Sequence, residues 1–188
     1  MRNTLSIWHA DHVNFGRLLN LLDGELKRMH DADSPDYERM LDVMYYMTHY
    51  PDVLHHPKED LVFARLKERD AKAGGKVDEL SAQHEQLRTL GQTLVSSLED
   101  VLSGSIVPME RIESAARSYV NGFRRHMHTE EADVLPLAAR LLDEADWARI
   151  DAEIHHFEDP LFGTNVMDRY AALRDHLGVE SPSPASVR

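Results

Sequence analysis

The chain has no cysteine among its 188 residues. This absence excludes disulfide bonds, cysteine nucleophiles, iron–sulfur clusters and thiolate zinc sites. Any metal site must therefore use imidazole and carboxylate ligands, which the 12 histidines and 33 acidic residues supply. The chain also lacks an apolar run near the ~20 residues that cross a bilayer, and its N-terminal MRNTLSIWHADH becomes polar before the apolar core of a signal peptide could form. We therefore expect a soluble, cytoplasmic protein.

Basic residues are scarce relative to acidic ones. The chain has 21 lysines and arginines against 33 acidic residues, which gives a net charge of -12. Such a surface repels phosphate groups, so we expect neither nucleic acid nor a membrane as a partner. The length is typical of one domain, or of one domain with an appendage, and allows a sizeable core.

The sequence also lacks strand-length stretches that alternate between apolar and polar residues, so a sheet is not expected. Apolar residues instead recur every three or four positions, which predicts helices. The first predicted helix covers 4–29, and the second runs from Ser34 and Pro35 to 69 with a break at Tyr50–Pro51. After a turn at Gly74–Gly75, the third covers 77–101. The fourth covers 112–137 and is kinked or ended by Pro136, and a fifth, shorter helix covers 144–157.

Four long amphipathic segments with short connections favour one fold class. We predict an all-α protein, an up-down-up-down four-helix bundle with a short C-terminal extra helix. The predicted division is a bundle domain over residues 1–142, a helical extension over 143–180, and a disordered tail over 181–188.

One spacing of histidine and glutamate occurs twice. His12 is followed after 43 residues by His55 and, four positions on, by Glu59; His84 is followed after 42 residues by His126, with Glu130 four positions on. All six lie in gaps of the apolar stripes, so they are predicted to face the core. Positions i and i+4 lie about 40° apart on a helix, so each pair can point at one site. A pair of metal ions would satisfy all six side chains; a polar network without metal is the alternative, but no Lys or Arg lies on these faces.

The remaining histidines mostly fall away from these stripes. His9, His30, His128 and His176 are predicted to be surface residues, His49 to be structural, and His155 and His156 to be non-ligands. His56 lies about 100° from the line of His55 and is an additional candidate ligand, or a hydrogen-bond donor behind the ligands. Asp60 and Glu131 lie off the inward line, and Glu131 becomes a candidate only if its helix is rotated or bulged.

The chain resembles the hemerythrin-like (HHE cation-binding) proteins, in particular the bacterial group with an H-HxxxE-H-HxxxE pattern. The resemblance covers about residues 4–142 and rests on Asp11–His12, YPDVLHHPKED at 50–60, His84, and HMHTEEADVLP at 126–136. It implies a non-haem site for two iron ions with an oxo or hydroxo bridge. Glu59 and Glu130 would bridge the ions, with His12 and His55 on one and His84 and His126 on the other.

The sequence departs from the oxygen-carrying hemerythrins at two places. The positions four residues from His84, Leu80 and Arg88, are not ligands, and the last motif has glutamate instead of the aspartate five residues after the histidine. Fewer imidazoles leave more open coordination positions, which favours ligand binding and redox chemistry over tuned O2 storage.

Several functions are compatible with this site. We expect binding or sensing of O2, NO or related small oxidants; a sensor would need a separate protein partner. The alternatives are an enzyme that acts on peroxide, NO or ferrous iron, and a helical interaction protein that holds zinc or no metal. Imidazole and carboxylate ligands also suit zinc and manganese.

Overall fold

The structure is a computed structural model that describes residues 2–31, 33–154 and 158–179. Within these ranges every regular element is helical, which confirms the predicted all-α class. The long helices are α1 (Arg2–His30), α2 (Tyr37–Tyr50), α3 (His56–Arg69), α4 (Gly74–Leu102) and α5 (Met109–Thr129). The shorter helices are α6 (Leu135–Leu141), α7 (Glu144–Glu153) and α8 (Ala171–His176), with single 3-10 turns at Ala71–Ala73 and Asp168–Tyr170.

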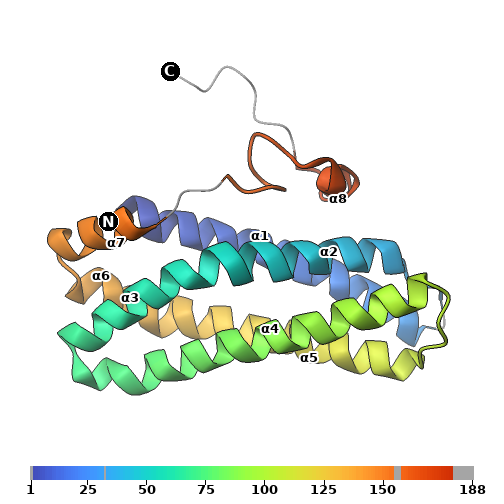
Figure 1. The fold of residues 1–188 in the computed structure, drawn as a ribbon, viewed down its shortest axis with the longest axis horizontal. Helices are drawn as coiled ribbons and strands as arrows, with labels where there is room; N and C mark the ends of the chain where they lie inside the picture. The colour runs from blue at the N-terminus through green and yellow to red at the C-terminus, as the bar shows by residue number, and fades with distance from the viewer. Residues whose placement is uncertain (1, 32, 155–157, 180–188) are drawn as a thin grey trace.

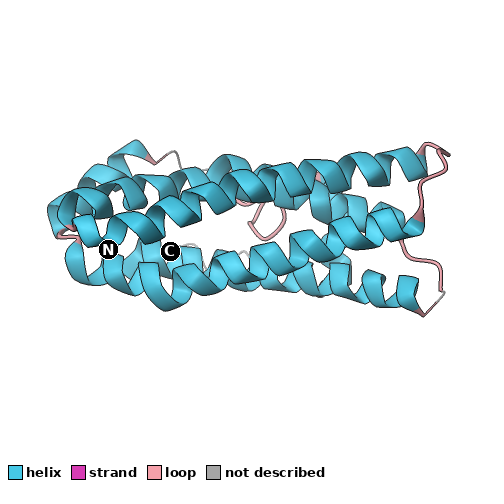
Figure 2. Ribbon diagram, turned by 90° about the horizontal axis from the view of Figure 1, so that it is seen from below, coloured by secondary structure: helices cyan, strands magenta, loops and turns pink. Residues whose placement is uncertain are grey.

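The long helices pack side by side as a bundle (Figure 1). α1 packs against α2 and α5, and α4 packs against the same two helices. α3 prolongs α2 along the bundle and packs against α4, α6 and α7. Figure 2 shows from below that the long helices run the length of the molecule, with connections at its ends. In the described residues no helix is both long and apolar enough to cross a membrane.

Two apolar clusters fill the bundle, and a layer of polar side chains separates them. On α1, buried His12 stands between Trp8, which belongs to one cluster, and Phe15, which belongs to the other. The buried histidines and glutamates of the other long segments lie between the same two clusters. The polar layer therefore lies inside the bundle, away from bulk water.

Two five-residue π-helical turns lie beside this layer. The first π turn (Pro51–His55) joins α2 directly to α3, and the second π turn (Glu130–Val134) joins α5 directly to α6. The α-helix is thus interrupted at Tyr50–Pro51, as predicted, but by a π turn that keeps the chain helical and not by a gap in the helix. A wider turn accommodates a proline, which has no N–H to donate, without ending the helix.

The second π turn changes which residues face the core beyond Glu130. Because it holds an extra residue, the buried line passes through Val134 and Ala138, and Leu137 is only half-buried. Leu137, predicted to continue the inward stripe, packs at the edge of one apolar cluster and does not lie on the buried line. Pro136 is the second residue of α6, where its missing N–H costs little, so it does not end the helical path.

Three predicted helix ends also need correction. α2 is capped by Asp36, whose carboxylate accepts the backbone N–H of Arg39 at 2.9 Å, and not by Ser34. Gly74 and Gly75 begin α4; the chain reverses before them, where the Asp70 carboxylate accepts the N–H of Lys72. α7 ends at Glu153. The Asp36 carboxylate thus sets the start of α2, and the Asp70 carboxylate sets the start of the 3-10 turn Ala71–Ala73 that leads into α4.

The C-terminal part packs on the outside of the long helices. α7 packs against α3, and residues 158–179 lie along the α1–α2 side of the bundle (Figure 1). Leu161, Tyr170 and Leu173 of this segment join the apolar core, and the Tyr46 hydroxyl donates to Asp159 at 2.7 Å. His155, His156 and the predicted tail from Ser181 lie outside the described residues.

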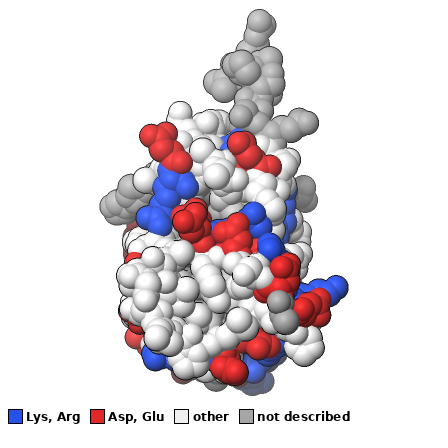
Figure 3. Space-filling model, turned by 90° about the vertical axis from the view of Figure 1, so that its right-hand side faces the viewer, with Lys and Arg blue, Asp and Glu red and all other residues white. Residues whose placement is uncertain are grey.

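Charged side chains of both signs lie next to one another on the end of the bundle that carries the α4–α5 connection. Figure 3 shows them as a band of interleaved acidic and basic groups beside an uncharged area. On this face, the described residues thus present alternating charge and not one continuous acidic field.

Candidate metal centre

Seven buried side chains from four helical segments converge in the polar layer. Each is between 0 % and 7 % exposed. They are His12 of α1; His55, His56 and Glu59 of the first π turn and α3; His84 of α4; and His126 and Glu130 of α5 and the second π turn. The six residues of the repeated spacing are thus brought together, and His56 joins them.

His12, His55 and Glu59 form one group of donor atoms. The His55 Nε2 lies 3.2 Å from the His12 Nε2 and 3.0 Å from the Glu59 Oε1, and the His12 Nε2 lies 3.5 Å from the same oxygen. Two atoms bound at about 2.1 Å to one ion lie about 3.0 Å apart at a right angle and about 3.4 Å apart at a tetrahedral angle. The three separations are those of ligands around a single ion.

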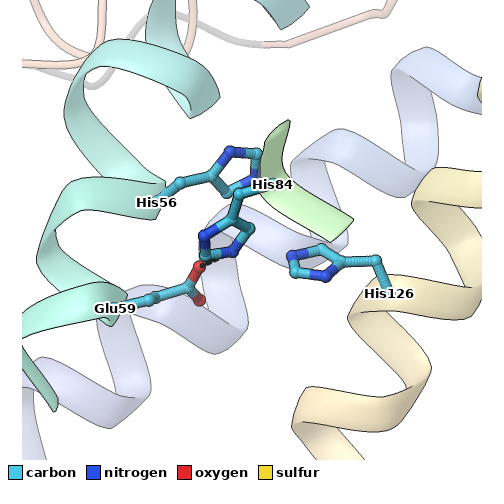
Figure 4. Close-up of side chains that lie close together, drawn as sticks. All are labelled: His56, Glu59, His84 and His126. Carbon is cyan, nitrogen blue, oxygen red and sulfur yellow. Dashed lines mark ion pairs between the residues drawn. The ribbon is translucent and has the colours of Figure 1, made fainter. Parts of the chain in front are cut away.

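His56, His84 and His126 form a second group, which shares Glu59 with the first. The four donor atoms all lie within 4.8 Å of one another, and Figure 4 shows the side chains converging from three helices. The His56 ring stacks on the His84 ring at 4.2 Å between centroids, with 11° between planes, and the His126 ring meets His84 edge-on at 4.7 Å. The His84 Nε2 lies 3.6 Å from the Glu59 Oε2.

Glu130 also reaches both groups. Its Oε2 lies 3.5 Å from the His12 Nε2, and its Oε1 lies 3.2 Å from the His126 Nε2 and 3.7 Å from the His84 Nε2. Each of the two glutamates therefore directs one oxygen toward each group of imidazoles. Two such carboxylates can link a pair of ions.

Many polar atoms of this layer have no hydrogen-bond partner among the described residues. They include both carboxylate oxygens of Glu59 and Glu130, both ring nitrogens of His56, and the Nε2 atoms of His84 and His126. A buried polar group left without a partner costs about 1–3 kcal/mol. Cations placed between these atoms would satisfy them together, so the residues present fit a metal site.

The imidazoles of His12 and His55 give a second indication that this layer suits a cation. Their Nδ1 atoms lie 2.8 Å from the Glu131 Oε1 and 2.9 Å from the Asp11 Oδ2. A carboxylate only accepts, so each Nδ1 carries a proton. Burial lowers the pKa of both rings, but Glu59 raises it more, to about 10 for His55, so a proton is also held between the two Nε2 atoms when no cation is bound. The two Nε2 atoms lie 3.2 Å apart, so a positive charge is needed between them, and a bound cation would supply it in place of the proton.

The other imidazoles are held in the same way. The Nδ1 of His84 lies 3.2 Å from the Asp60 Oδ1, and the Nδ1 of His126 lies 3.2 Å from the Gln83 Oε1. Such outer partners fix the tautomer and the orientation of metal-binding histidines. All these Nε2 atoms therefore point into the polar layer before any ion arrives.

His56 has a buried carboxylate behind it. The Asp52 Oδ1 lies 3.3 Å from the His56 Nδ1, and Asp52 is 7 % exposed. Burial raises the pKa of Asp52 to about 7. Burial and the neighbouring His84 lower the pKa of His56 well below its ordinary value, so the ring is neutral and one of its nitrogens carries a lone pair that can bind.

The two glutamates differ in protonation when no cation is bound. Burial raises the pKa of Glu59, but His55 and His12 lower it more, so that it lies well below the ordinary value. Burial and the charge of Glu59 raise the pKa of Glu130 to about 7. Burial and His84 lower the pKa of His126 to about 3, which keeps this imidazole neutral. Burial lowers the pKa of His84, but Asp60 and Glu130 raise it more, to about 11. The layer thus supplies an anionic carboxylate, neutral imidazoles at His56 and His126, and protonated imidazoles whose protons a bound cation would displace.

Sequence reasoning missed most of the outer partners. Asp60 and Glu131 were placed off the inward line, which is right for the ligand layer, but they accept from His84 and His12. The seven side chains of the polar layer are called the donor layer from here on. The sequence signal for an outer partner is its position directly before or after a residue of this donor layer, which holds for Asp11, Asp60, Gln83 and Glu131. Asp52 precedes His56 by one turn.

The histidines outside this layer are where the sequence predicted them. His9, His30, His49, His128 and His176 are exposed. None of these five belongs to either donor group in the described part of the chain. The prediction that His155 and His156 are non-ligands concerns residues outside the described ranges.

Comparison with known proteins gives one family. The hemerythrin HHE cation-binding domain matches residues 3–138, which contain the whole donor layer. No curated protein and no solved structure matches the chain significantly. With a buried cluster of histidines and glutamates suited to cations at its centre, the chain belongs to the hemerythrin HHE cation-binding domain family.

Proposed function

We propose that this chain binds two iron ions in its polar layer and there binds or senses O2, NO or a related small oxidant. The observation that carries the proposal is the pair of donor groups that share Glu59. His12 and His55 would hold one ion, and His84, His126 and His56 the other. Glu59 and Glu130, which face both groups, would link them.

The chain's own residues prepare the site for small ligands. Bound iron would supply a redox-active centre able to take a diatomic ligand or peroxide. Phe15 packs on the His55 ring at 5.0 Å, and Phe123 lies 5.7 Å from His56. These rings limit the space beside the donor layer and keep it dry, which favours a small, weakly polar ligand over a large substrate.

His56 bears on the comparison with oxygen carriers. α4 has a single histidine in the layer, but His56 stacks against His84 from the neighbouring α3 and adds an imidazole to the same group. This supports a site richer in imidazole than the repeated spacing alone implies. Reversible O2 binding therefore belongs to the proposal together with sensing.

The proposal includes the up-down-up-down order of the four long helical segments. Support comes from the packing of α1 and α4 against the same two neighbours and from the chain reversals at the bundle ends. In this order the segments would bring the two halves of the repeated spacing to one level of the bundle.

The decisive experiment is metal analysis of protein expressed with added iron, followed by absorption spectra before and after O2, NO and peroxide. We expect two irons per chain and a stable, reversible adduct with O2 or NO. One metal or none would contradict the two-ion site. Repeated consumption of the added oxidant would instead support an enzyme, and zinc retained in place of iron would support the interaction-protein alternative.

The matched variants are Glu59→Ala and His128→Ala. Glu59 is fully buried and shared by both donor groups, whereas His128 is an exposed histidine on α5. Glu59→Ala should lose both ions, and His128→Ala should keep them. Unchanged metal content in Glu59→Ala would contradict its role as the shared ligand.

A further inference from the structure

The donor layer is closed to solvent except at one edge. His12 is 7 % exposed, whereas the other six members of the layer are 0 % to 2 % exposed. An ion that enters the bundle by the shortest route therefore meets His12 first. The groups in front of His12 decide what an arriving ion binds before it is buried.

His9 and Glu131 lie in front of His12. One oxygen of Glu131, Oε1, lies 2.8 Å from the buried His12 Nδ1 and 3.1 Å from the His9 Nδ1. The side chain of His9 is 66 % exposed and that of Glu131 is 35 % exposed. A single carboxylate thus joins an imidazole in solvent to an imidazole of the donor layer.

The separation of these two surface groups is that of a hydrogen bond, and it is also the separation that a metal chelate needs. Two ligands at a right angle on an ion with bonds of about 2.1 Å lie about 3.0 Å apart. The His9 Nδ1 and the Glu131 Oε1 are 3.1 Å apart. His9 lies three positions before His12 on α1, so both imidazoles face the same side of the Glu131 carboxylate.

The other outer partners are less suited to receive an ion. Asp11 and Asp52 are buried at 9 % and 7 % exposed, and Gln83 is a neutral amide. Asp60 is exposed, but among the described groups its Oδ1 contacts the Ser81 hydroxyl and His84, and no surface imidazole. The pairing of imidazole with carboxylate at the surface is thus found at the His12 edge.

We infer that His9 and Glu131 form an uptake site for a divalent cation, which they pass to His12 and the donor layer. The inference rests on the proposed function, because only a chain that takes up iron needs such a site. The exchange changes no oxidation state: hydration water leaves the ion, the Glu131 carboxylate and the His9 Nδ1 replace it, and the proton of the His9 Nδ1 goes to solvent. The His12 Nε2, which faces the donor layer, gives up its own proton to solvent and then replaces both ligands as the ion moves inward. As an ordinary surface ion pair, His9 and Glu131 would contribute little and would not affect uptake.

The first test measures the rate at which the metal-free protein takes up ferrous iron without oxygen. His9→Ala should slow uptake roughly tenfold, the lower end of the effect of removing an outer group at a metal site, with the final iron content unchanged. The control is His30→Ala, an exposed histidine on the same helix. Uptake at the unsubstituted rate in His9→Ala, equal slowing in His30→Ala, or a lower final content at a normal rate would each overturn the inference.

The second test detects cation binding at the surface directly. The donor layer of the full chain is first filled with Zn2+, and unbound zinc is removed. Mn2+ is then added while the histidine ring signals are followed by NMR. Mn2+ should broaden the His9 signals before those of His30 and His128, and Glu131→Gln should weaken this effect. Equal broadening of all three would overturn the inference. If the unsubstituted chain took up no iron, the proposed function would fail, and the Mn2+ experiment would still decide whether His9 and Glu131 bind a cation.

Discussion

His55 and His56 are adjacent residues that serve different donor groups. About 100° separates neighbours on a helix, so the two rings lie on different sides of Glu59. The His55 ring faces His12 at 5.1 Å, and the His56 ring faces His84 at 4.2 Å. One short stretch of chain therefore supplies imidazoles to both halves of the site.

The role of His56 can be tested with one substitution and one control. His56→Ala should weaken the ion held with His84 and His126 roughly tenfold or more, because it removes an imidazole of that group. Iron content after competition with a soluble chelator measures this effect, and thermal unfolding of the metal-free variant shows whether the fold is retained. His128→Ala should behave as the unsubstituted chain. A folded His56→Ala variant that retains all its iron would show that the ring only packs against His84.

At the scale of the elements, the close approach of α4 to its neighbours sets the shape of the bundle beside the site. A Cβ on Gly91 of α4 would lie 2.7 Å from the Thr48 Cγ2 on α2 and 3.2 Å from the Tyr119 Cε2 on α5. The Thr48 hydroxyl donates to the Met44 carbonyl at 2.8 Å, which fixes the position of its methyl group. Glycine is therefore required for packing at this position, although it weakens an isolated helix.

Gly91→Ala and Gly24→Ala should have opposite effects on stability. Crowding at Gly91 costs about 1–3 kcal/mol and exceeds the gain of up to about 1 kcal/mol from helix propensity, so the free energy of unfolding should fall. A Cβ on Gly24 of α1 meets no described atom within 4 Å, so Gly24→Ala should raise it by about 0.5–1 kcal/mol. Urea unfolding of both variants gives the two values. Equal stabilisation by both would contradict the close packing of α4 on α2.

At the scale of the whole molecule, the donor layer divides the core. The two apolar clusters meet across a layer of seven histidines and glutamates, and His56, Glu59 and Glu130 of this layer have no hydrogen-bond partner among the described residues. A cation that binds only the folded chain stabilises it by mass action. The stability of the bundle should therefore depend on its metal content.

Removal of metal should lower the unfolding temperature. At a free metal concentration 100 times the dissociation constant, the stabilisation that is lost is about 2.7 kcal/mol. Differential scanning calorimetry with and without a strong chelator measures the change. A chelator should not change the unfolding temperature of His84→Ala prepared without metal, which controls for direct effects of the chelator. Equal unfolding temperatures of loaded and metal-free unsubstituted protein would contradict this prediction.

The periodicity of the sequence by itself determined much of the molecule. Apolar steps of three and four residues predict the long helices and the inward faces that bury His12, His55, Glu59 and His84, because a helix has a fixed 3.6-residue repeat. The absence of cysteine limits the donors to imidazole and carboxylate. The repeated spacing then predicts that donors from two halves of the chain share one level of the bundle.

Only the tertiary structure decided what lies beside the inward line. The π turns cannot be read from periodicity. An extra residue in one turn leaves the spacing of apolar residues on either side unchanged and only shifts which positions face the core after it. They account for the half-buried position of Leu137 and for a helical path that passes Pro51 through a π turn. The contact of His56 with His84, and of His9 and His12 with one oxygen of Glu131, depends on how neighbouring helices are placed against each other. That placement follows from the packing of side chains across the whole bundle, which no local pattern of residues specifies.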